Sequence, residues 1–309
     1  MRQGEIAPKG SWTGNPLGGV KAPEPLILPD PAARFSRTAE RLEALSQGHP
    51  MADWLRFMAR LSHAQHVAAA KLGPSRAPEA AFVAQAVEAR MPPLAADGHR
   101  RDPLWRDGLA VVLDGLDAGE APAPAREAMA KLRKRGAEGL ESLADAFLQG
   151  GVEPADAGAA LYVAAALQVY FTRLAATLSA AELRLLPERG LCPCCGSPPV
   201  SGVITASGGT PGVRYLYCSL CATAWNHVRA VCITCGESRS LSLKSVEGET
   251  GAVKAETCDE CHTYAKSLYQ AQDTKVDPFA DDLASLGLDI MVAEAGWARH
   301  APNPLLLAG

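Results

Sequence analysis

Eight of the nine cysteines in this 309-residue chain form four Cys-x-x-Cys pairs, and all nine lie between Cys192 and Cys261. The last two pairs repeat the spacing of the first two pairs forty residues later, so the segment is an internal repeat. Two Cys-x-x-Cys turns that face each other place four sulfurs in a tetrahedron, at roughly 2.3 Å from a metal such as zinc. The spacing therefore predicts two small ribbons, each with one four-thiolate metal site.

The grouping of the cysteines follows from the residues between the pairs, which have the character of β-hairpins. Strands are expected at 200–206 and 213–217 in the first repeat, and at 241–246 and 252–257 in the second. A ribbon that closes on itself takes its ligands in sequence. The predicted sites are then Cys192, Cys195, Cys218 and Cys221 in the first ribbon, and Cys232, Cys235, Cys258 and Cys261 in the second. An interleaved cross-brace of the same pairs is the alternative.

The cysteines alone do not decide the metal. Gly196 and Gly236 follow the leading pairs, where a tight turn directs backbone N–H groups at sulfur and a residue without Cβ fits best. Such knuckles are typical of rubredoxins and of zinc ribbons alike, and four thiolates bind either iron or zinc. On spacing alone zinc is favoured, since most sites of this kind are structural.

The cysteine and histidine residues outside the four pairs are not interpreted as metal ligands. Cys194 has no counterpart in the second repeat, where Thr234 stands; we interpret it as a bystander, with a reactive thiol, an alternative ligand and an intermolecular disulfide as the alternatives. His262 adjoins a ligand cysteine and is expected beside the site. His63 and His66 share a helix face but lack a third ligand nearby, so we assign them to the surface or to packing.

The charge distribution and the start of the chain bear on partners and compartment. Residues 190–309 contain eight Lys or Arg against twelve Asp or Glu, whereas residues 1–189 balance at twenty-two each. Thiolates add negative charge to the acidic half, which argues against a nucleic-acid partner. Residues 1–19 contain neither an apolar signal segment nor a twin-arginine motif. We therefore expect a cytoplasmic protein with metal-bound thiolates rather than disulfides.

Proline and glycine divide the first half of the chain into helical segments. After a flexible arm at 1–25, a helical domain is expected at 26–187, with helices near 31–47, 51–72, 78–91, 103–118, 123–135 and 137–150. The residues expected to face inward from the first two helices are Phe35, Leu42, Leu45, Trp54, Phe57, Met58 and Leu61.

The most apolar segment, 154–178, raises the question of a membrane span. Its stretch without charge lies between Asp156 and Arg173, which is shorter than the roughly 20 residues that a bilayer requires. We predict a buried central helix of the helical domain and no membrane span.

The remaining segments complete an α+β fold. The first four-cysteine ribbon is expected at 188–230, the second at 231–272, and a C-terminal helix and tail at 273–309. Within that last segment we expect one helix from 277 to about 295, opened by Asp277-Pro278. One side of it should carry Leu283, Leu286, Ile290 and Met291.

Catalytic motifs are missing from the sequence. It contains no nucleophile elbow, P-loop, dinucleotide fingerprint or His-Glu-x-x-His helix. Four thiolates also leave a metal no open position for substrate. We therefore predict a binding or maturation factor and not an enzyme.

The motifs around the cysteines resemble the FdhE family of formate dehydrogenase accessory proteins. The resemblance rests on Cys192-Pro-Cys-Cys-Gly-Ser-Pro-Pro-Val-Ser, on Arg214-Tyr-Leu-Tyr-Cys-Ser-Leu-Cys-Ala-Thr-Ala-Trp225 with His227-Val-Arg229 and Cys232, on Lys254-Ala-Glu-Thr-Cys258 through Thr263-Tyr264, on Asp281-Asp-Leu-Ala-Ser-Leu286, on Asn303-Pro304, and on Ala39-Glu-Arg-Leu42 with Leu55-Arg-Phe57 and Ala64-Gln65. It spans the chain from about Leu26 onward. The arm before Leu26 and the extra Cys194 depart from the family pattern.

The resemblance implies a non-catalytic cytoplasmic chaperone for maturation of formate dehydrogenase. Such proteins look rubredoxin-like in their metal sites and are thought to bind the catalytic subunit of the enzyme before it is exported. This implies two iron ions rather than zinc, with a homodimer left open. The helical domain would dock the immature subunit while the ribbons sense or adjust the redox state of its cofactors.

Two other classes of function stay open. A structural zinc-ribbon docking module for another protein or a nucleic acid fits the cysteines, although the acidic ribbon half disfavours nucleic acid. A thiol–disulfide oxidoreductase also uses Cys-x-x-Cys, but this chain shows four such pairs in a strict repeat, without the βαβ context of that motif.

Overall fold

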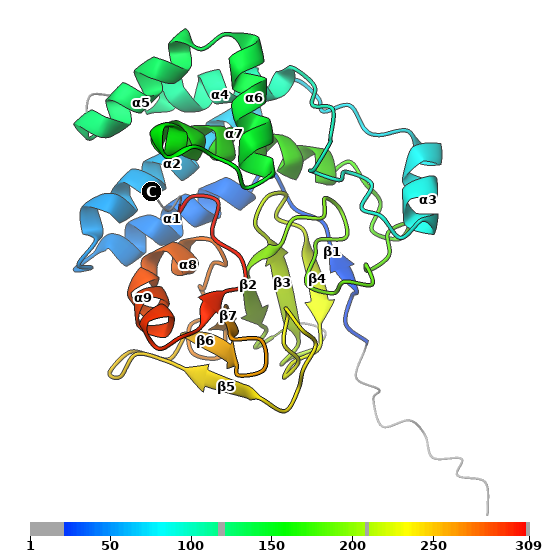
Figure 1. Cartoon of the computed structure of the whole chain (residues 1–309), viewed down its shortest axis with the longest axis vertical. Coiled ribbons are helices and arrows are strands. Elements are labelled where there is room, and N and C mark those ends of the chain that lie inside the picture. The colour runs from blue at the N-terminus through cyan, green and yellow to red at the C-terminus, as the bar shows by residue number, and fades with distance from the viewer. Residues whose placement is uncertain (1–21, 117–120, 208–209, 307–309) are drawn as a thin grey trace, which may run out of the picture.

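The computed structural model describes residues 22–116, 121–207 and 210–306. A layer of helices covers one end of a single β-sheet, and two short helices pack beside that sheet (Figure 1). The flexible arm predicted at 1–25 falls mostly outside the described residues. The α+β class is confirmed.

The helical layer forms where apolar residues recur at helical spacing. Its helices are α1 (Arg34–Ser46), α2 (Ala52–Lys71), α3 (Ala80–Glu88), α4 (Leu104–Gly115), α5 (Ala123–Lys134), α6 (Ala137–Leu148) and α7 (Ala157–Ala175), the last preceded by a 3-10 turn at Pro154–Asp156. Each predicted helix is confirmed to within a few residues. Of the residues expected to face inward, Phe35, Leu42 and Leu61 are fully enclosed, whereas Leu45 and Trp54 are half-buried.

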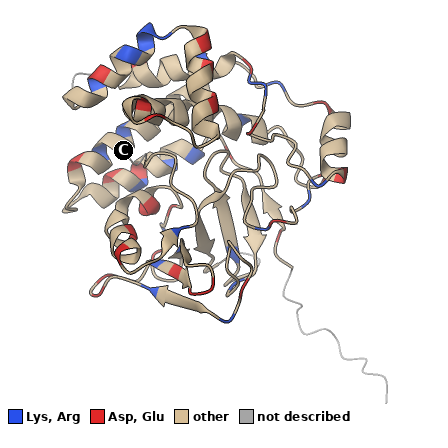
Figure 2. Cartoon of the chain, viewed as in Figure 1, with Lys and Arg blue, Asp and Glu red and all other residues tan. Residues whose placement is uncertain are grey.

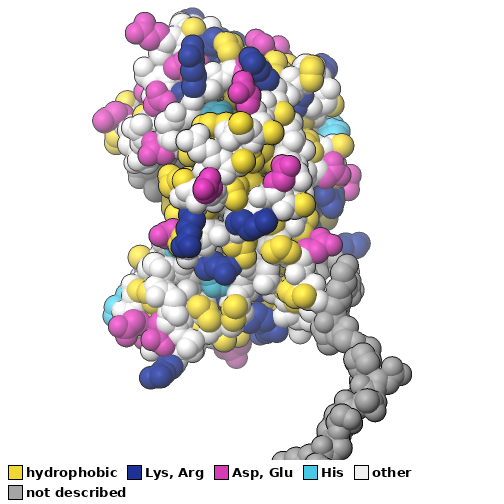
Figure 3. Space-filling view, turned by 90° about the vertical axis from the view of Figure 1, so that its right-hand side faces the viewer, with side chains coloured by type: hydrophobic (Ala, Val, Ile, Leu, Met, Phe, Trp, Pro, Cys, Tyr) yellow, Lys and Arg dark blue, Asp and Glu magenta, His cyan; other side chains and the backbone are white. Residues whose placement is uncertain are grey.

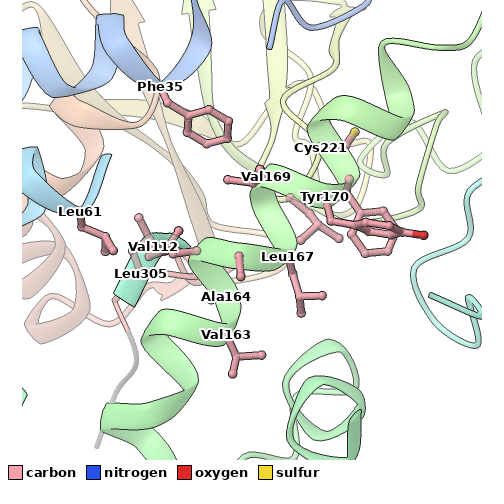
Figure 4. Packing of buried hydrophobic residues seen from close by; sticks show 14 of the residues in the cluster. Phe35, Leu61, Val112, Val163, Ala164, Leu167, Val169, Tyr170, Cys221 and Leu305 are labelled. Atoms are coloured by element: carbon pink, nitrogen blue, oxygen red, sulfur yellow. The ribbon is translucent and has the colours of Figure 1, made fainter. Parts of the chain in front are cut away.

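Helix α7 is the centre of this layer and packs against α2, α4, α5 and α6. Every side chain from Tyr162 to Thr172 is buried, which confirms the predicted central helix (Figure 4). Pro154–Ala175 is the one described segment that is long and apolar enough to cross a membrane, and 78% of its apolar window is buried inside the fold. Burial among helices accounts for its composition, since a helix that is apolar on all sides suits a protein core.

Charged residues of both signs lie on the outer helices: the charges of α5 are mainly Lys and Arg, and those of α6 are Asp and Glu alone (Figure 2). The face shown in Figure 3 likewise mixes side chains of both signs with hydrophobic ones. The absence of a nucleic-acid partner stays a prediction.

The two cysteine repeats join in one eight-stranded sheet. The strands are β1 (Leu26–Ile27), β2 (Pro199–Ile204), β3 (Arg214–Cys218), β4 (Ala224–His227), β5 (Leu241–Lys244), β6 (Val253–Cys258), β7 (Thr263–Tyr269) and β8 (Ala298–Arg299). Their order is β1-β4-β3-β2-β7-β6-β5, with β8 paired to β7. The two predicted hairpins, β2–β3 and β5–β6, are confirmed. Each repeat adds a third strand, β4 or β7, and the parallel pair β2–β7 connects the repeats.

The prediction of one helix from 277 to about 295 was wrong. The structure has α8 (Ala280–Ala284) and α9 (Leu286–Glu294), separated at Ser285. Lys266 Nζ donates to the carbonyl oxygens of Asp282 (2.7 Å) and Ser285 (3.3 Å), which a continuous helix would use for its own N–H groups. The break turns α9, so that Leu288 and Val292 pack inward while Ile290 and Met291 are exposed.

Lys266 also belongs to a group that we call the buried charge cluster: Lys266, Asp282, Asp289 and Arg299. Lys266 Nζ lies 2.6 Å from Asp289 Oδ2 and 3.3 Å from Asp282 Oδ1. Arg299 pairs with both carboxylates, and Asn303 donates to Asp282 Oδ2 at 2.7 Å. The cluster ties α8, α9 and the C-terminal tail to β7, with equal numbers of positive and negative groups.

Candidate metal centres

The first cysteine quartet lies at one end of the first ribbon. Cys192 and Cys195 occupy the turn before β2, and Cys218 and Cys221 occupy the turn between β3 and β4. Cys192 Sγ is 3.5 Å from Cys221 Sγ, and Cys195 Sγ is 3.4 Å from Cys218 Sγ. All four sulfurs lie within 4.8 Å of one another and all four side chains are buried.

The second quartet repeats this arrangement in the second ribbon. Cys232 Sγ is 3.7 Å from Cys261 Sγ, and Cys235 Sγ is 3.7 Å from Cys258 Sγ. The four sulfurs again lie within 4.8 Å of one another. The structure therefore groups the cysteines in sequence, as expected, and not as a cross-brace.

Backbone conformation explains how each Cys-x-x-Cys turn closes. Gly196 and Gly236, at φ +77° and +78°, take the left-handed conformation that glycine adopts without strain. The trailing turns have the same conformation at Ala222 (φ 59°) and His262 (φ 51°). Sequence reasoning found the glycines and missed these two residues, because nothing in an alanine or histidine signals a positive φ. The exposed His262 therefore has a backbone role beside the site, and its carbonyl accepts from Ala298 N at 2.8 Å.

Hydrogen-bond donors surround the sulfurs in both ribbons. Backbone N–H groups of Leu220 and Cys221 point at Cys218 Sγ from 3.4 and 3.3 Å. A hydroxyl stands two residues beyond the last cysteine of each ribbon: Thr223 Oγ1 accepts from Cys221 Sγ at 3.2 Å, and Thr263 Oγ1 lies 3.1 Å from Cys261 Sγ. The backbone donors that point at Cys218 Sγ favour thiolate over thiol.

The electrostatics of the quartets favour a bound cation. Burial and contacts with the other thiols raise the pKa of Cys192 and Cys218 well above the ordinary value. Burial acts in the same direction at Cys221, but hydrogen bonds from Cys192 and the other thiols lower the pKa of Cys221 well below that value. Such a quartet does not hold four negative charges by itself, and a metal ion removes the conflict.

The donor set fits a tetrahedral ion. Four sulfurs at roughly 2.3 Å from a metal lie about 3.8 Å from one another. The S–S separations of 3.4 to 3.7 Å within the quartets are close to that spacing. Either quartet could hold iron or zinc, since both metals accept four thiolates. Metal binding by the eight cysteines stays a prediction.

The first quartet is enclosed by the helical layer. Its cysteines belong to the same hydrophobic cluster as α7, and Figure 4 shows Cys221 beside that helix near Tyr170. The loop before α4 covers the leading turn, where Leu94 N donates to Cys194 O at 2.8 Å and Ala96 N to Cys195 O at 2.9 Å. We call this quartet the enclosed centre.

A buried amide pair fixes the other turn of the enclosed centre. Gln65 Nε2 on α2 donates to Gln168 Oε1 on α7 at 2.9 Å, and Gln168 Nε2 donates to Ser219 O at 2.8 Å. Ser219 lies between Cys218 and Cys221. Three segments that are remote in sequence therefore converge on one set of four sulfurs.

The second quartet has no such cover. Cys235 is exposed and Cys261 is half-buried, whereas Cys232 and Cys258 are buried. Hydrogen bonds from Thr263 and the other thiols, acting against partial burial, lower the pKa of Cys261 to about 7. We call this quartet the open centre.

The neighbouring residues have the roles of structural partners. Cys194 is buried, and its backbone N–H points at Cys192 Sγ from 3.4 Å. An intermolecular disulfide through Cys194 would require its cover to open. At the matching position of the open centre, Thr234 Oγ1 lies 2.8 Å from Thr263 Oγ1 and 2.7 Å from His300 Nδ1. Trp225 is buried, and its indole N–H donates to Arg189 O at 2.8 Å.

The rings of His63 and His66 on α2 lie 6.3 Å apart between centroids and are tilted by 41°. Within the described residues they belong to no group of three ligand-type side chains. Their assignment to surface or packing agrees with the structure.

Comparison with known proteins gives consistent matches along the chain. Three family models match in succession: "FdhE, N-terminal" at residues 23–188, "FdhE, central domain" at 191–229 and "FdhE, C-terminal domain" at 230–306. A protein described as "Protein FdhE homolog" from Edwardsiella ictaluri is 42% identical over 286 residues, which cover 92% of each chain. "Protein FdhE" is 38% identical in Salmonella enteritidis and 37% identical in Escherichia coli, with the same coverage.

A solved structure has the same fold. The crystal structure of the FdhE protein from Pseudomonas aeruginosa matches with a TM-score of 0.83 and 37% sequence identity. The match covers 92% of this chain and 99% of that chain.

Proposed function

The chain belongs to the FdhE family of formate dehydrogenase accessory proteins, and we propose that it is a non-catalytic maturation factor that binds the catalytic subunit of formate dehydrogenase in the cytoplasm. In this proposal the enclosed centre holds the fold together, and the open centre provides assembly or redox control of the bound subunit.

The contrast between the two centres supports this role most directly. The enclosed centre lies within the main hydrophobic cluster, between the helical layer and the first ribbon. The open centre presents the side chain of Cys235 to solvent at the far ribbon. Electron exchange between proteins requires a close approach of the two redox groups, which an exposed thiolate permits and a covered one impedes. The same chain thus offers one centre suited to structure and one suited to contact.

The chemistry of the donor set supports a non-enzymatic role. A tetrahedral ion held by four thiolates has no open position for substrate. With iron bound, each centre would supply one-electron redox chemistry, whereas zinc would supply structure alone. We take iron as the metal, by family resemblance, and zinc as the alternative.

Capture from a host that makes formate dehydrogenase tests the proposal. The tagged chain, purified without oxygen, should retain the catalytic subunit, and deletion of the gene for this chain should abolish formate oxidation.

Variants at single cysteines separate the roles of the two centres. Cys235→Ser should leave the capture intact and still fail to restore formate oxidation in the deletion strain. Cys195→Ser should abolish capture, because loss of the enclosed centre loosens the fold. Cys194→Ser is the matched control and should behave as the parent. A deletion strain with normal formate oxidation, together with a tagged chain that captures nothing, would refute the proposed function.

A further inference from the structure

A cavity of about 730 Å³ lies where the three parts of the chain meet. One wall is α1 together with residues 27–30, the floor is the first ribbon, and the opposite wall is the segment 274–279 before α8. Cavities of this size hold small ligands, and junctions between structural units are frequent ligand sites. Neither metal centre accounts for this cavity, since the cysteines of both quartets lie outside its lining.

Arg34 in the wall of the cavity is buried and forms no ion pair with a described residue, and the negative charge that acts on it is that of Asp277. Its side chain is only 8% exposed, and its guanidinium lies 3.3 Å from the centroid of the Phe279 ring. Its Nη1 donates to Thr38 Oγ1 at 2.8 Å, and its buried Nε has no hydrogen-bond partner among the described residues. Among the described residues, no carboxylate lies within ion-pair distance of Arg34.

The nearest acid is already engaged. Asp277 Oδ1 accepts from Thr38 Oγ1 at 3.0 Å, from Phe279 N at 3.0 Å and from Ala280 N at 2.8 Å. Asp277 therefore opens α8 rather than pairing with Arg34. A buried guanidinium that lacks a directly paired anion is destabilising. Burial lowers the pKa of Arg34 to about 10, which leaves it charged at neutral pH.

Two more cations line the same cavity. Arg37 stands one turn beyond Arg34 on α1, and Lys275 lies on the opposite wall. Both are exposed, and neither forms an ion pair with a described residue. Arg41 is different, because Asp281 and Asp273 neutralise it at 2.6 Å each. The lining has three carboxylates, Asp30, Glu40 and Asp277, against four cations, Arg34, Arg37, Arg41 and Lys275.

The other lining residues are apolar or aromatic. Leu28, Pro278 and Phe279 face the cavity from its walls, and Tyr217 lies on its floor. This surface suits the uncharged part of a ligand, while the cations suit an oxyanion. A guanidinium binds phosphate through two parallel hydrogen bonds, and a phosphate monoester carries a charge of about −1.5 to −2 at neutral pH.

We propose that this cavity binds a phosphorylated small molecule, with Arg34 as the principal phosphate ligand and Arg37 and Lys275 as supporting cations. This site goes beyond the proposed function and requires neither metal. The cavity lies next to the enclosed centre, because Ala222 on its floor directly follows Cys221 in the chain and has a strained φ of 59°. A bound ligand would therefore connect α1 and the segment before α8 to the trailing turn of the enclosed centre.

Binding of defined probes to the full chain, with its metals, tests the inference. Adenosine monophosphate and inorganic pyrophosphate are titrated by calorimetry at fixed ionic strength, with succinate as a carboxylate of similar charge. Saturable binding of a phosphate probe, with succinate at least tenfold weaker, is the expected result. Arg34→Met should weaken the phosphate probe roughly 10- to 100-fold, the loss expected for charged hydrogen bonds. Arg56→Met is the control, since Arg56 lies outside the cavity lining, is half-buried on α2 and pairs with Asp53.

Arg34 is buried, so its variant could fail to fold. Arg37→Ala with Lys275→Ala then provides the test, because both side chains are exposed, and this variant should weaken the phosphate probe at least tenfold. The inference is overturned if neither phosphate probe binds saturably, if succinate binds as tightly as phosphate, or if the folded variants bind like the parent.

Discussion

Removal of the positive charge at Lys266 should unfold the ribbon half of the protein at markedly lower denaturant concentration. The Lys266 ammonium is fully buried and contacts Asp289 at 2.6 Å, the Asp282 carbonyl at 2.7 Å and Ser285 Oγ at 2.9 Å. Lys266→Met keeps a similar volume but leaves Asp282 and Asp289 facing Arg299 alone. Loss of one partner of a buried ion pair typically costs about 3–5 kcal/mol, and the remaining Arg299 places the expected cost at about 3 kcal/mol.

The assay is urea unfolding of the metal-loaded protein, followed by tryptophan fluorescence, because Trp297 packs in the cluster formed by α9, β6 and β7. Lys131→Met is the matched control. Lys131 is exposed on α5 and forms no ion pair with a described residue, so its replacement should change the free energy of unfolding by at most about 0.5 kcal/mol.

A second substitution separates uncompensated charge from lost contact. Lys266→Met leaves the buried charge cluster with one excess negative charge. Addition of Asp289→Asn restores neutrality, so the double variant should be more stable than Lys266→Met alone. The reasoning is refuted if Lys266→Met costs less than about 1 kcal/mol, or if Asp289→Asn adds its own full cost to that of Lys266→Met.

Three further predictions follow from the centres and their surroundings. A chelator added to metal-loaded protein should remove the metal of the open centre first, leaving about half of the metal bound. A time course of metal release measures this. Simultaneous loss of both ions would contradict the inference that only the enclosed centre is shielded from solvent. Gly190→Ala should destabilise the junction of the ribbons, because a Cβ at Gly190 would lie 2.5 Å from Ile233 O. Gly287→Ala on α9 is the control: its Cβ meets nothing within 4 Å, so the variant should be neutral or stabilising. Equal melting temperatures of the two variants would contradict this. Burial, with the neighbouring Arg214, lowers the pKa of His227 from 6.5 to about 4, so the unfolded chain binds the proton more readily and stability should fall as pH drops from about 6.5 towards 4. His227→Gln should flatten that part of the pH profile of unfolding, and an unchanged slope would count against it.

The sequence was most informative where the chemistry is local. Cysteine spacing was enough to group the eight sulfurs as the structure groups them, since each quartet closes within one hairpin. Gly196 and Gly236 were predictable because a positive φ selects glycine. Helices were predictable because their apolar periodicity and their Pro and Gly boundaries depend only on the sequence of each segment.

Contacts between distant segments were beyond sequence reasoning. The cover over the enclosed centre depends on Leu94, Ala96 and Gln168, which no local pattern distinguishes from other residues of helices and loops. The break between α8 and α9 depends on Lys266, which lies on a strand and takes two helix carbonyls. The different exposure of the two quartets could not be predicted either, because the two repeats have the same cysteine spacing while their surroundings in the fold differ.

The parallel pairing of β2 with β7 has a consequence for how the protein is made. Gly202 pairs with Ser267, so one edge of β2 stays open until the ribosome has released a strand some sixty residues further along. During that interval the first ribbon presents unpaired backbone groups to other nascent chains. A truncated product ending near residue 230 would keep that edge permanently, and we expect it to aggregate even with its four cysteines intact. Synthesis of the second repeat thus ends the exposure of this edge of the first ribbon.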